Sequence, residues 1–172
     1  MTRTGLLEIE VANAQRAVAV RIRQLRAVIA AVVADAGVRR GAISVAIVDD
    51  LTIRRLNHQF LGHDYATDVL SFVFARDGAR LEGEIIASGE TAAAAAPRYG
   101  WPPEHELLLY VVHGALHLVG YDDRAPSSRA AMRRQEAVYL AGRGIELGAA
   151  TVRRDAGRPA ARRRAARGER AP

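Results

Sequence analysis

The sequence predicts an α/β fold, a small mixed four-stranded sheet packed with helices. Short β-type runs at 6–13, 43–48, 69–74 and 81–88 are separated or followed by stretches of helical periodicity. The resulting order, β-α-β-α-β-β-α-α-α, is typical of one α/β domain. A length of 172 residues with 49% hydrophobic residues leaves room for one such domain and its core. We therefore expect a single domain over 1–150 and a tail over 151–172.

The first half predicts two strands, each followed by a helix. Residues 6–13 alternate as a strand does. Apolar residues at helical spacing predict a helix over 15–36, which Gly37 would cap. The β-branched run at 43–48 predicts a second strand, and the following acidic pair indicates the start of a short helix over 51–60.

The second half predicts a hairpin and three helices. Strands at 69–74 and 81–88 are joined by a turn-rich segment, and an alanine-rich helix follows Gly89 and stops before Pro97. Pro102 and Pro103 begin a helix that continues to about Leu118. A last helix is expected from 126 to about 141.

The basic charge of the chain is confined to the tail. Residues 152–172 contain eight arginines and two acidic residues, which account for the whole net charge of +6 and leave residues 1–151 neutral. Their Pro, Gly, Ala and Arg composition predicts disorder. Two interpretations stay open, a solvated extension or a contact with RNA phosphates.

Composition excludes several classes of protein. The chain has no cysteine, so disulfides and thiolate metal sites are impossible and any metal must bind nitrogen and oxygen. No apolar run reaches the length of a membrane span, and the first residues lack the apolar region of a signal peptide. These features favour a cytoplasmic protein.

The helix that ends near Leu118 carries a metal-ligand pattern. His113 and His117 are four residues apart, so both imidazoles leave the same helix face. Gly120 permits a sharp exit from the helix, after which Asp122 or Asp123 can return as a third, oxygen ligand. Such a pair also occurs by chance, but unpartnered imidazoles on this apolar helix would be costly. Three ligands with one open position indicate a catalytic zinc site on a central helix.

Gly114 follows the first of these histidines. An HExxH zinc peptidase has a glutamate there, which acts as the general base. The pattern therefore resembles a peptidase in its ligands but lacks the residue that peptidase chemistry requires.

The segment HGALHLVGYDD at 113–123 resembles HGxLHLxGYDH, the signature of the YbeY endoribonucleases, also called rRNA maturation factors. The block LNHQFLGHDYATDVLSF at 56–72 is similar to the family's LNxxYRGKDxPTDVLSF, and GEI at 83–85 to its GDI. Met132 and Glu136 fall where the family has a methionine and a glutamate. The resemblance covers most of residues 1–145 and excludes the tail.

The resemblance implies one zinc ion per chain, held by His113, His117 and the residue at the third histidine position, Asp123. Asp122 is the rival oxygen ligand. It also implies a single-strand-specific endoribonuclease that matures the 3′ end of small-subunit rRNA and acts in ribosome quality control. The expected partners are rRNA and the small ribosomal subunit, with no DNA and no membrane.

The chain departs from the family pattern at the metal site and at the arginine block. Asp123 replaces a histidine, and Leu61 and His63 replace the arginine and lysine of the YRGK block. Arg54, Arg55 or the tail could replace the lost arginine. We consider Glu84, which matches the acid of GDI, as the general base, or else as a solvent-facing strand residue. His58, His63 and His105 are interpreted as surface or helix-end residues.

The leading functional hypothesis is a zinc-dependent hydrolase of RNA phosphodiesters. A zinc metallopeptidase is the first alternative, favoured by the ligand spacing and disfavoured by Gly114. A non-enzymatic, ribosome-associated factor with structural zinc is the second.

Overall fold

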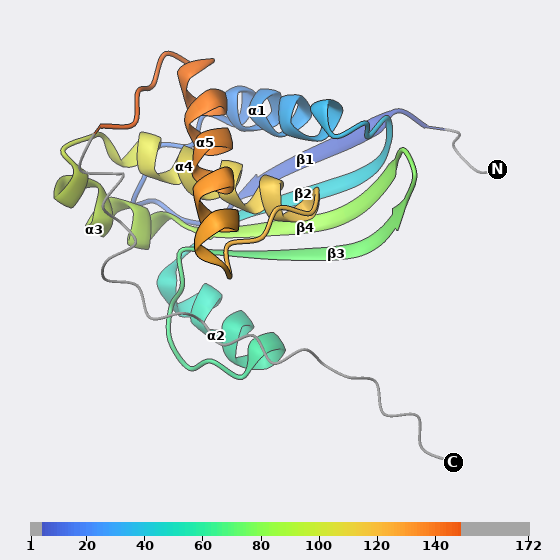
Figure 1. Ribbon diagram of the computed structural model, residues 1–172. Helices are drawn as coiled ribbons and strands as arrows, with labels where there is room; N and C mark the ends of the chain where they lie inside the picture. The colour runs from blue at the N-terminus through green and yellow to red at the C-terminus, as the bar shows by residue number, and fades with distance from the viewer. Residues whose placement is uncertain (1–4, 149–172) are drawn as a thin grey trace.

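A computed structural model describes residues 5–148 and has the predicted order of elements (Figure 1). The strands are β1 (Leu7–Asn13), β2 (Arg40–Val48), β3 (Val69–Asp77) and β4 (Arg80–Ser88). The helices are α1 (Ile22–Asp35), α2 (Asp50–Leu61), α3 (Gly89–Tyr99), α4 (Pro103–Leu118) and α5 (Pro126–Ala141). The predicted fold class is confirmed, whereas the tail over 151–172 lies outside the described residues.

The strands form one mixed sheet in the order β1-β2-β4-β3. β1, β2 and β4 are parallel, and β3 runs antiparallel to β4. Because β3 is an edge strand, one of its backbone edges has no strand partner among the described residues. This exposed edge lies next to the helix that carries the metal-ligand pattern, since α4 packs on β3 and β4.

The two faces of the sheet are covered unequally. In Figure 1, α1, α4 and α5 lie on one face and α2 lies on the other. The main core lies on the first face, where Ile85 of β4 packs with residues of α1 and α4. A smaller cluster on the second face contains Ile53 of α2 and Ile86 of β4. Neighbouring residues of β4 therefore point to opposite faces, as strand geometry requires.

Helix α4 is the centre of the fold. Pro103 begins it, and most of its residues are buried between the sheet and the helices α1 and α5. No helix among residues 5–148 is both long and apolar enough to cross a membrane. A helix held on nearly all sides is a rigid support for the side chains it presents at its remaining open position.

The helix predicted to begin near Gln15 begins only at Ile22. The side chain of Gln15 is buried and binds the backbone of Val18 in both directions, with Val18 N–H donating to Oε1 at 3.0 Å and Nε2 donating to the Val18 carbonyl at 3.0 Å. These side-chain bonds stabilise a loop in place of the first helical turns.

The alanine-rich helix does not stop before Pro97. It continues through this proline to Tyr99 and ends at Gly100, which adopts a left-handed φ of 70°. Proline removes only its own N–H bond, and a C-terminal glycine then satisfies the last carbonyls, since Gly100 N–H donates to the Pro97 carbonyl at 3.3 Å.

Candidate metal centre

Helix α4 brings its two C-terminal histidines together. His113 and His117 lie one turn apart, with ring centroids 4.6 Å apart and ring planes at 81°. Their Nε2 atoms are 3.0 Å apart. Both side chains are mostly shielded by the helices and the sheet, with 17% and 16% of their surface exposed. The pair therefore presents two nitrogen atoms at one partly open position.

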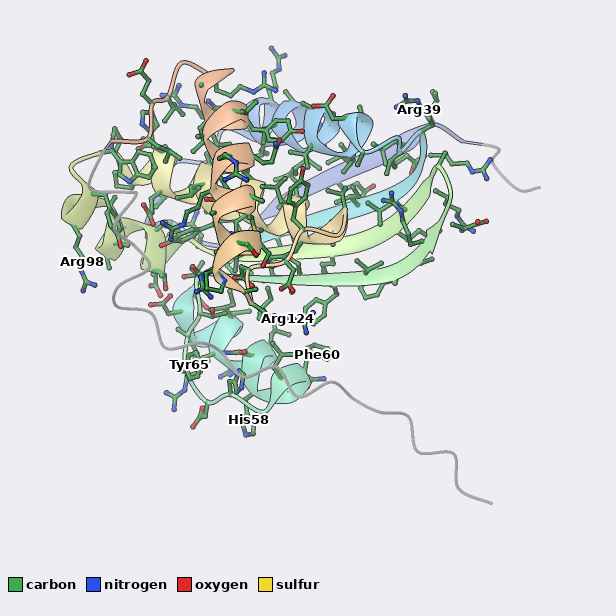
Figure 2. The ribbon with its side chains drawn as sticks, viewed as in Figure 1. Arg39, His58, Phe60, Tyr65, Arg98 and Arg124 are labelled. Carbon is green, nitrogen blue, oxygen red and sulfur yellow. The ribbon has the colours of Figure 1, made fainter. Side chains whose placement is uncertain are left out.

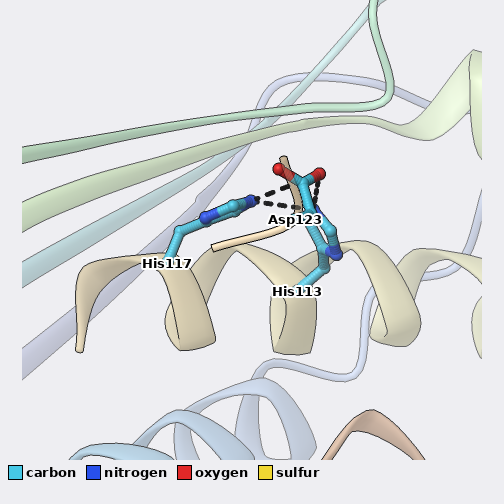
Figure 3. Close-up of side chains that lie close together, drawn as sticks. All are labelled: His113, His117 and Asp123. Carbon is cyan, nitrogen blue, oxygen red and sulfur yellow. Dashed lines mark hydrogen bonds and ion pairs between the residues drawn. The ribbon is translucent and has the colours of Figure 1, made fainter. Parts of the chain in front are cut away.

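The chain returns to this position through the turn at Gly120. Gly120 has a φ of 103°, and Tyr121 N–H donates to the Leu116 carbonyl at 3.0 Å, which closes the end of the helix. Asp123 then places its Oδ2 at 3.7 Å from His113 Nε2 and at 3.8 Å from His117 Nε2 (Figure 3). The structure thus brings together the three side chains that the sequence singled out as metal ligands.

The three atoms fit a single tetrahedral ion. Zinc–ligand bonds of about 2.0–2.1 Å at tetrahedral angles separate neighbouring ligand atoms by roughly 3.3–3.4 Å. The observed separations of 3.0, 3.7 and 3.8 Å fall on both sides of this value. Among the described residues, His113, His117 and Asp123 form the group of His and acidic side chains that could hold a metal ion.

The hydrogen bonds made by the two Nδ1 atoms determine which nitrogen of each imidazole faces the cluster. His117 Nδ1 lies 2.9 Å from the Tyr121 carbonyl, which only accepts hydrogen bonds, so Nδ1 carries the proton. His113 Nδ1 lies 2.7 Å from Oε1 of Glu136 and donates to that carboxylate in the same way. The Nε2 atoms, which carry the lone pairs, therefore face the cluster, as is usual for metal-binding histidines.

Glu136 is the functional residue that sequence reasoning left without a role. It lies on α5, is only 8% exposed, and approaches His113 from a position 23 residues further along the chain. The match of Glu136 to a glutamate of the family pattern was the one sequence feature that pointed to a role. Helical spacing could not reveal the contact, because it relates residues within one helix and not residues of α5 to residues of α4. In the structure, its hydrogen bond with Nδ1 fixes the orientation and the tautomer of the His113 ring.

We expect Glu136→Ala to lower metal affinity by roughly 10- to 100-fold, the usual effect of losing such an outer partner. Glu136→Gln should have a smaller effect, because an amide oxygen still accepts from His113 Nδ1. Competition with a chromophoric zinc chelator measures both variants. Equal affinities for the wild type and Glu136→Ala would contradict this role.

Asp122 and Asp123 have different environments. Arg124 Nε lies 3.0 Å from both carboxylate oxygens of Asp122, and this hydrogen bond holds the pKa of Asp122 below its usual value. Asp122 is thus engaged with a guanidinium, whereas Asp123 faces the two imidazoles. This geometry favours Asp123 over Asp122 as the third ligand.

The structure does not bring Glu84 to the histidines. Its neighbours Gly83 and Ile85 face α4, since a Cβ on Gly83 would meet Leu118 and Ile85 contacts Gly114. Glu84 therefore points to the opposite face, the one that carries Ile86 and α2. Strand alternation explains the separation, and the placement does not support Glu84 as the general base.

Gly114 packs directly against the sheet. A Cβ at this position would lie 2.8 Å from Ile85 Cγ2, 3.0 Å from Ser71 Oγ and 3.2 Å from Val69 Cγ2. The Ser71 hydroxyl also donates to the Gly114 carbonyl at 3.2 Å. No glutamate of the peptidase kind could occupy this site, so the structure gives a steric reason for the missing base.

We expect Gly114→Ala to lower the free energy of unfolding by about 1–3 kcal/mol, because the methyl group overpacks the contact between α4 and the sheet. Gly142→Ala is the matched control, since Gly142 has a helical φ of −60° and a Cβ there would meet nothing closer than 3.6 Å. Urea unfolding compares the two. If Gly114→Ala lowers the free energy of unfolding no more than Gly142→Ala does, the packing of α4 against the sheet at Gly114 is not tight.

An open cleft with a volume of about 360 Å³ adjoins the cluster. Its lining joins the edge strand to the turn after α4 and consists of Ser71, Val73, His117, Leu118, Gly120, Tyr121, Asp122, Asp123 and Arg124. Because His117 and Asp123 belong to this lining, a molecule bound in the cleft would reach the candidate metal centre.

The remaining histidines lie away from this centre. His63 stacks on Tyr65 with ring centroids 5.4 Å apart, and His105 meets the edge of Trp101 at the start of α4. His58 is exposed on α2 (Figure 2). None of the three belongs to the His–His–Asp group of the described residues.

Leu61 takes the position of the lost arginine at the end of α2, where it is partly exposed. Arg54, one possible replacement, is engaged by Asp64 through bonds of 2.8 and 3.1 Å. The Asp64 carboxylate raises the pKa of Arg54, so the guanidinium is charged and is already paired with an acid.

Fold and site together define residues 5–148 as a small α/β domain with a candidate metal centre at the open end of its central helix. The family model described as Endoribonuclease YbeY matches residues 10–144. The chain belongs to this family of endoribonucleases, which confirms the resemblance in the sequence.

Individual relatives agree with this membership. An Endoribonuclease YbeY of Rhodopirellula baltica is 49% identical over 129 residues, 74% of this chain and 66% of the relative. One of Chlorobaculum parvum is 42% identical over 109 residues, 63% of this chain and 77% of the relative. The solution structure of TM1509 from Thermotoga maritima superposes with a TM-score of 0.55 at 24% identity, over 81% of this chain and 92% of that chain, and supports the fold.

Proposed function

We propose that this chain is a zinc-dependent endoribonuclease that cuts single-stranded RNA and acts on rRNA in the cytoplasm, in the maturation of the 3′ end of the small-subunit rRNA and in ribosome quality control. The observation that carries the proposal is the cluster of His113, His117 and Asp123 beside an open cleft. Relatives named endoribonucleases support the choice of RNA as substrate.

The ligand set supports zinc as the metal. Two imidazole nitrogens and one carboxylate oxygen form a common catalytic zinc set, and the chain has no cysteine to offer instead. When bound, zinc would supply a Lewis acid that polarises a phosphoryl oxygen and stabilises developing charge. The chain's own contribution is positional: Glu136 and the Tyr121 carbonyl hold the two imidazoles, and the turn at Gly120 brings in Asp123.

The protein's own side chains also restrict the chemistry. Gly114 and the sheet behind it exclude the glutamate base of the HExxH peptidases. Of the residues that line the cleft, the carboxylates are Asp122 and Asp123, and the first is engaged by Arg124. The site therefore favours phosphodiester cleavage over peptide hydrolysis.

Matched digestions test this proposal. The full-length protein is incubated with single-stranded RNA, with the same RNA as a duplex, and with unfolded casein, each with and without chelator. We expect cleavage of the single-stranded RNA alone, lost with chelator and restored by zinc. Casein cleavage would favour the peptidase, and ribosome binding without any cleavage would favour the structural-zinc alternative.

A further inference from the structure

None of the three phenylalanines of the chain belongs to the main core. Phe60 of α2 and Phe72 of β3 are in contact, with ring centroids 5.3 Å apart, and Phe74 follows two residues later on β3. Phe60 is 56% exposed and Phe74 is 66% exposed. Phenylalanine is normally among the most buried residues, so a group of exposed rings indicates a binding surface. We call Phe60, Phe72 and Phe74 the phenylalanine surface.

A β-bulge sets the position of the most exposed ring. The register between β3 and β4 shifts between Val73 and Ala75, which leaves Phe74 without a partner residue on β4. Bulges are frequent beside functional sites, where they redirect a side chain. Because β3 is the edge strand, no further strand of the described residues covers this segment.

The phenylalanine surface and the metal cleft meet at β3 from opposite faces of the sheet, since Phe72 pairs with Glu84 of β4 whereas Ser71 faces Gly114 of α4. Ser71 and Val73 line the cleft, and Phe72 and Phe74 lie next to them on the same strand. A chain-like ligand that crosses the edge of the sheet would pass from the phenylalanine surface to the cleft within a few residues of β3.

Arg124 offers a cation on the other side of β3. It is the cationic side chain in the lining of the cleft, and 72% of its side chain is exposed. Its Nε is held by the two oxygens of Asp122, each at 3.0 Å, which orients the guanidinium. These bonds use only one edge of the group, so its terminal amino groups can take a phosphate.

We propose that single-stranded RNA crosses the edge strand β3 to reach the metal centre, with a base stacked on the phenylalanine surface and a phosphate bound by Arg124. This inference rests on the proposed ribonuclease function and adds the path of the substrate. Stacked aromatic rings next to a cation are the usual means of binding single strands without sequence preference. Leu61 stands where the family's YRGK block has an arginine, and in this chain Arg124 supplies the cation on the path.

The test of base stacking uses RNA with a single abasic nucleotide, moved one position at a time along an unstructured oligonucleotide. For the full-length zinc-loaded protein we expect one position, near the cut, to lower kcat/KM by about 5- to 150-fold, the range for loss of a stacked base. In the double variant Phe60→Leu/Phe74→Leu, an abasic nucleotide at this position should lower kcat/KM no more than one at any other position. In Phe60→Tyr/Phe74→Tyr, which keeps the aromatic rings, the larger decrease in kcat/KM at this position should remain. The single variant Phe74→Leu repeats the test if the double variant does not fold.

The test of the phosphate contact is Arg124→Gln, with Arg98→Gln on the exposed end of α3 as the control. We expect KM for RNA to rise about tenfold in Arg124→Gln, and the dependence of log(1/KM) on log[salt] to become shallower by about one unit. Arg98→Gln should change neither quantity.

Three outcomes would overturn the proposal. Abasic sensitivity that is unchanged in the leucine variants, or an Arg124→Gln variant with unchanged KM and salt dependence, would each show that RNA takes another path while the ribonuclease function stands. Self-association of the wild-type protein that Phe60→Leu/Phe74→Leu abolishes would assign the surface to a second copy of the chain. A wild-type protein that cuts no RNA would instead refute the proposed function itself.

Discussion

Replacing His113 by alanine is expected to remove bound zinc and to lower RNA cleavage by at least roughly a thousandfold. His113 supplies one of two nitrogen ligands, and its Nε2 lies 3.0 Å from that of His117. A catalytic metal contributes several kcal/mol to the transition state, and each 1.36 kcal/mol is a factor of ten in rate. Metal analysis of the purified variant and steady-state cleavage of single-stranded RNA measure the two effects.

His105→Ala is the matched control, because His105 lies on the same helix but meets Trp101 instead of the cluster. It should retain one zinc per chain and full activity. Circular dichroism shows whether His113→Ala is folded, and His117→Ala provides an independent second test. Full activity in a folded, metal-free His113→Ala protein would refute a metal-dependent mechanism.

Replacing Asp123 by alanine is expected to lower zinc affinity by at least about a hundredfold, because even outer partners of a ligand contribute 10- to 100-fold. The physical reason is the loss of the carboxylate oxygen that lies 3.7 and 3.8 Å from the two imidazole nitrogens. Asp123→His, which restores the three-histidine pattern implied by the family resemblance, should keep the metal.

Asp122→Ala distinguishes the two neighbouring acids. Asp122 is held by Arg124, so its loss should leave zinc affinity nearly unchanged and affect RNA binding through the released arginine. Zinc affinities from chelator competition compare the variants directly. Loss of zinc in Asp122→Ala together with its retention in Asp123→Ala would reverse the ligand assignment.

The order of the elements was predictable because each local pattern agrees with the final fold. The β-branched run before Asp49 became β2, and Asp49 caps α2 by accepting from Thr52 N–H at 2.7 Å. The start of α1 was not predictable from periodicity, since a buried Gln15 takes over backbone bonds that a helix would use. Side-chain competition of this kind depends on tertiary burial, which the local pattern does not contain.

The candidate metal centre was predictable as far as it is local in sequence. His113, His117 and Asp123 lie within eleven consecutive residues, and a helix followed by a glycine turn brings them together. Glu136 lies on another helix, and only the packing of α5 on α4 shows that it holds His113. Glu84 could not be placed from spacing, because the face to which a strand residue points depends on which face the helices cover.

The single feature that separates this site from a peptidase also has a structural origin. Gly114 is required where α4 approaches β3 and β4, so the same glycine that permits close packing excludes the HExxH base. The chemistry of the site and the stability of the fold are thereby linked at one residue.

The most direct test of the central claim is a zinc titration of the metal-free, full-length protein, followed by cleavage of single-stranded RNA. If His113, His117 and Asp123 hold one ion that cleavage requires, activity will rise from background in proportion to added zinc and reach its plateau at one equivalent per chain. Undiminished cleavage by the metal-free protein, or a zinc affinity in Asp123→Ala equal to that of the wild type, would contradict the account.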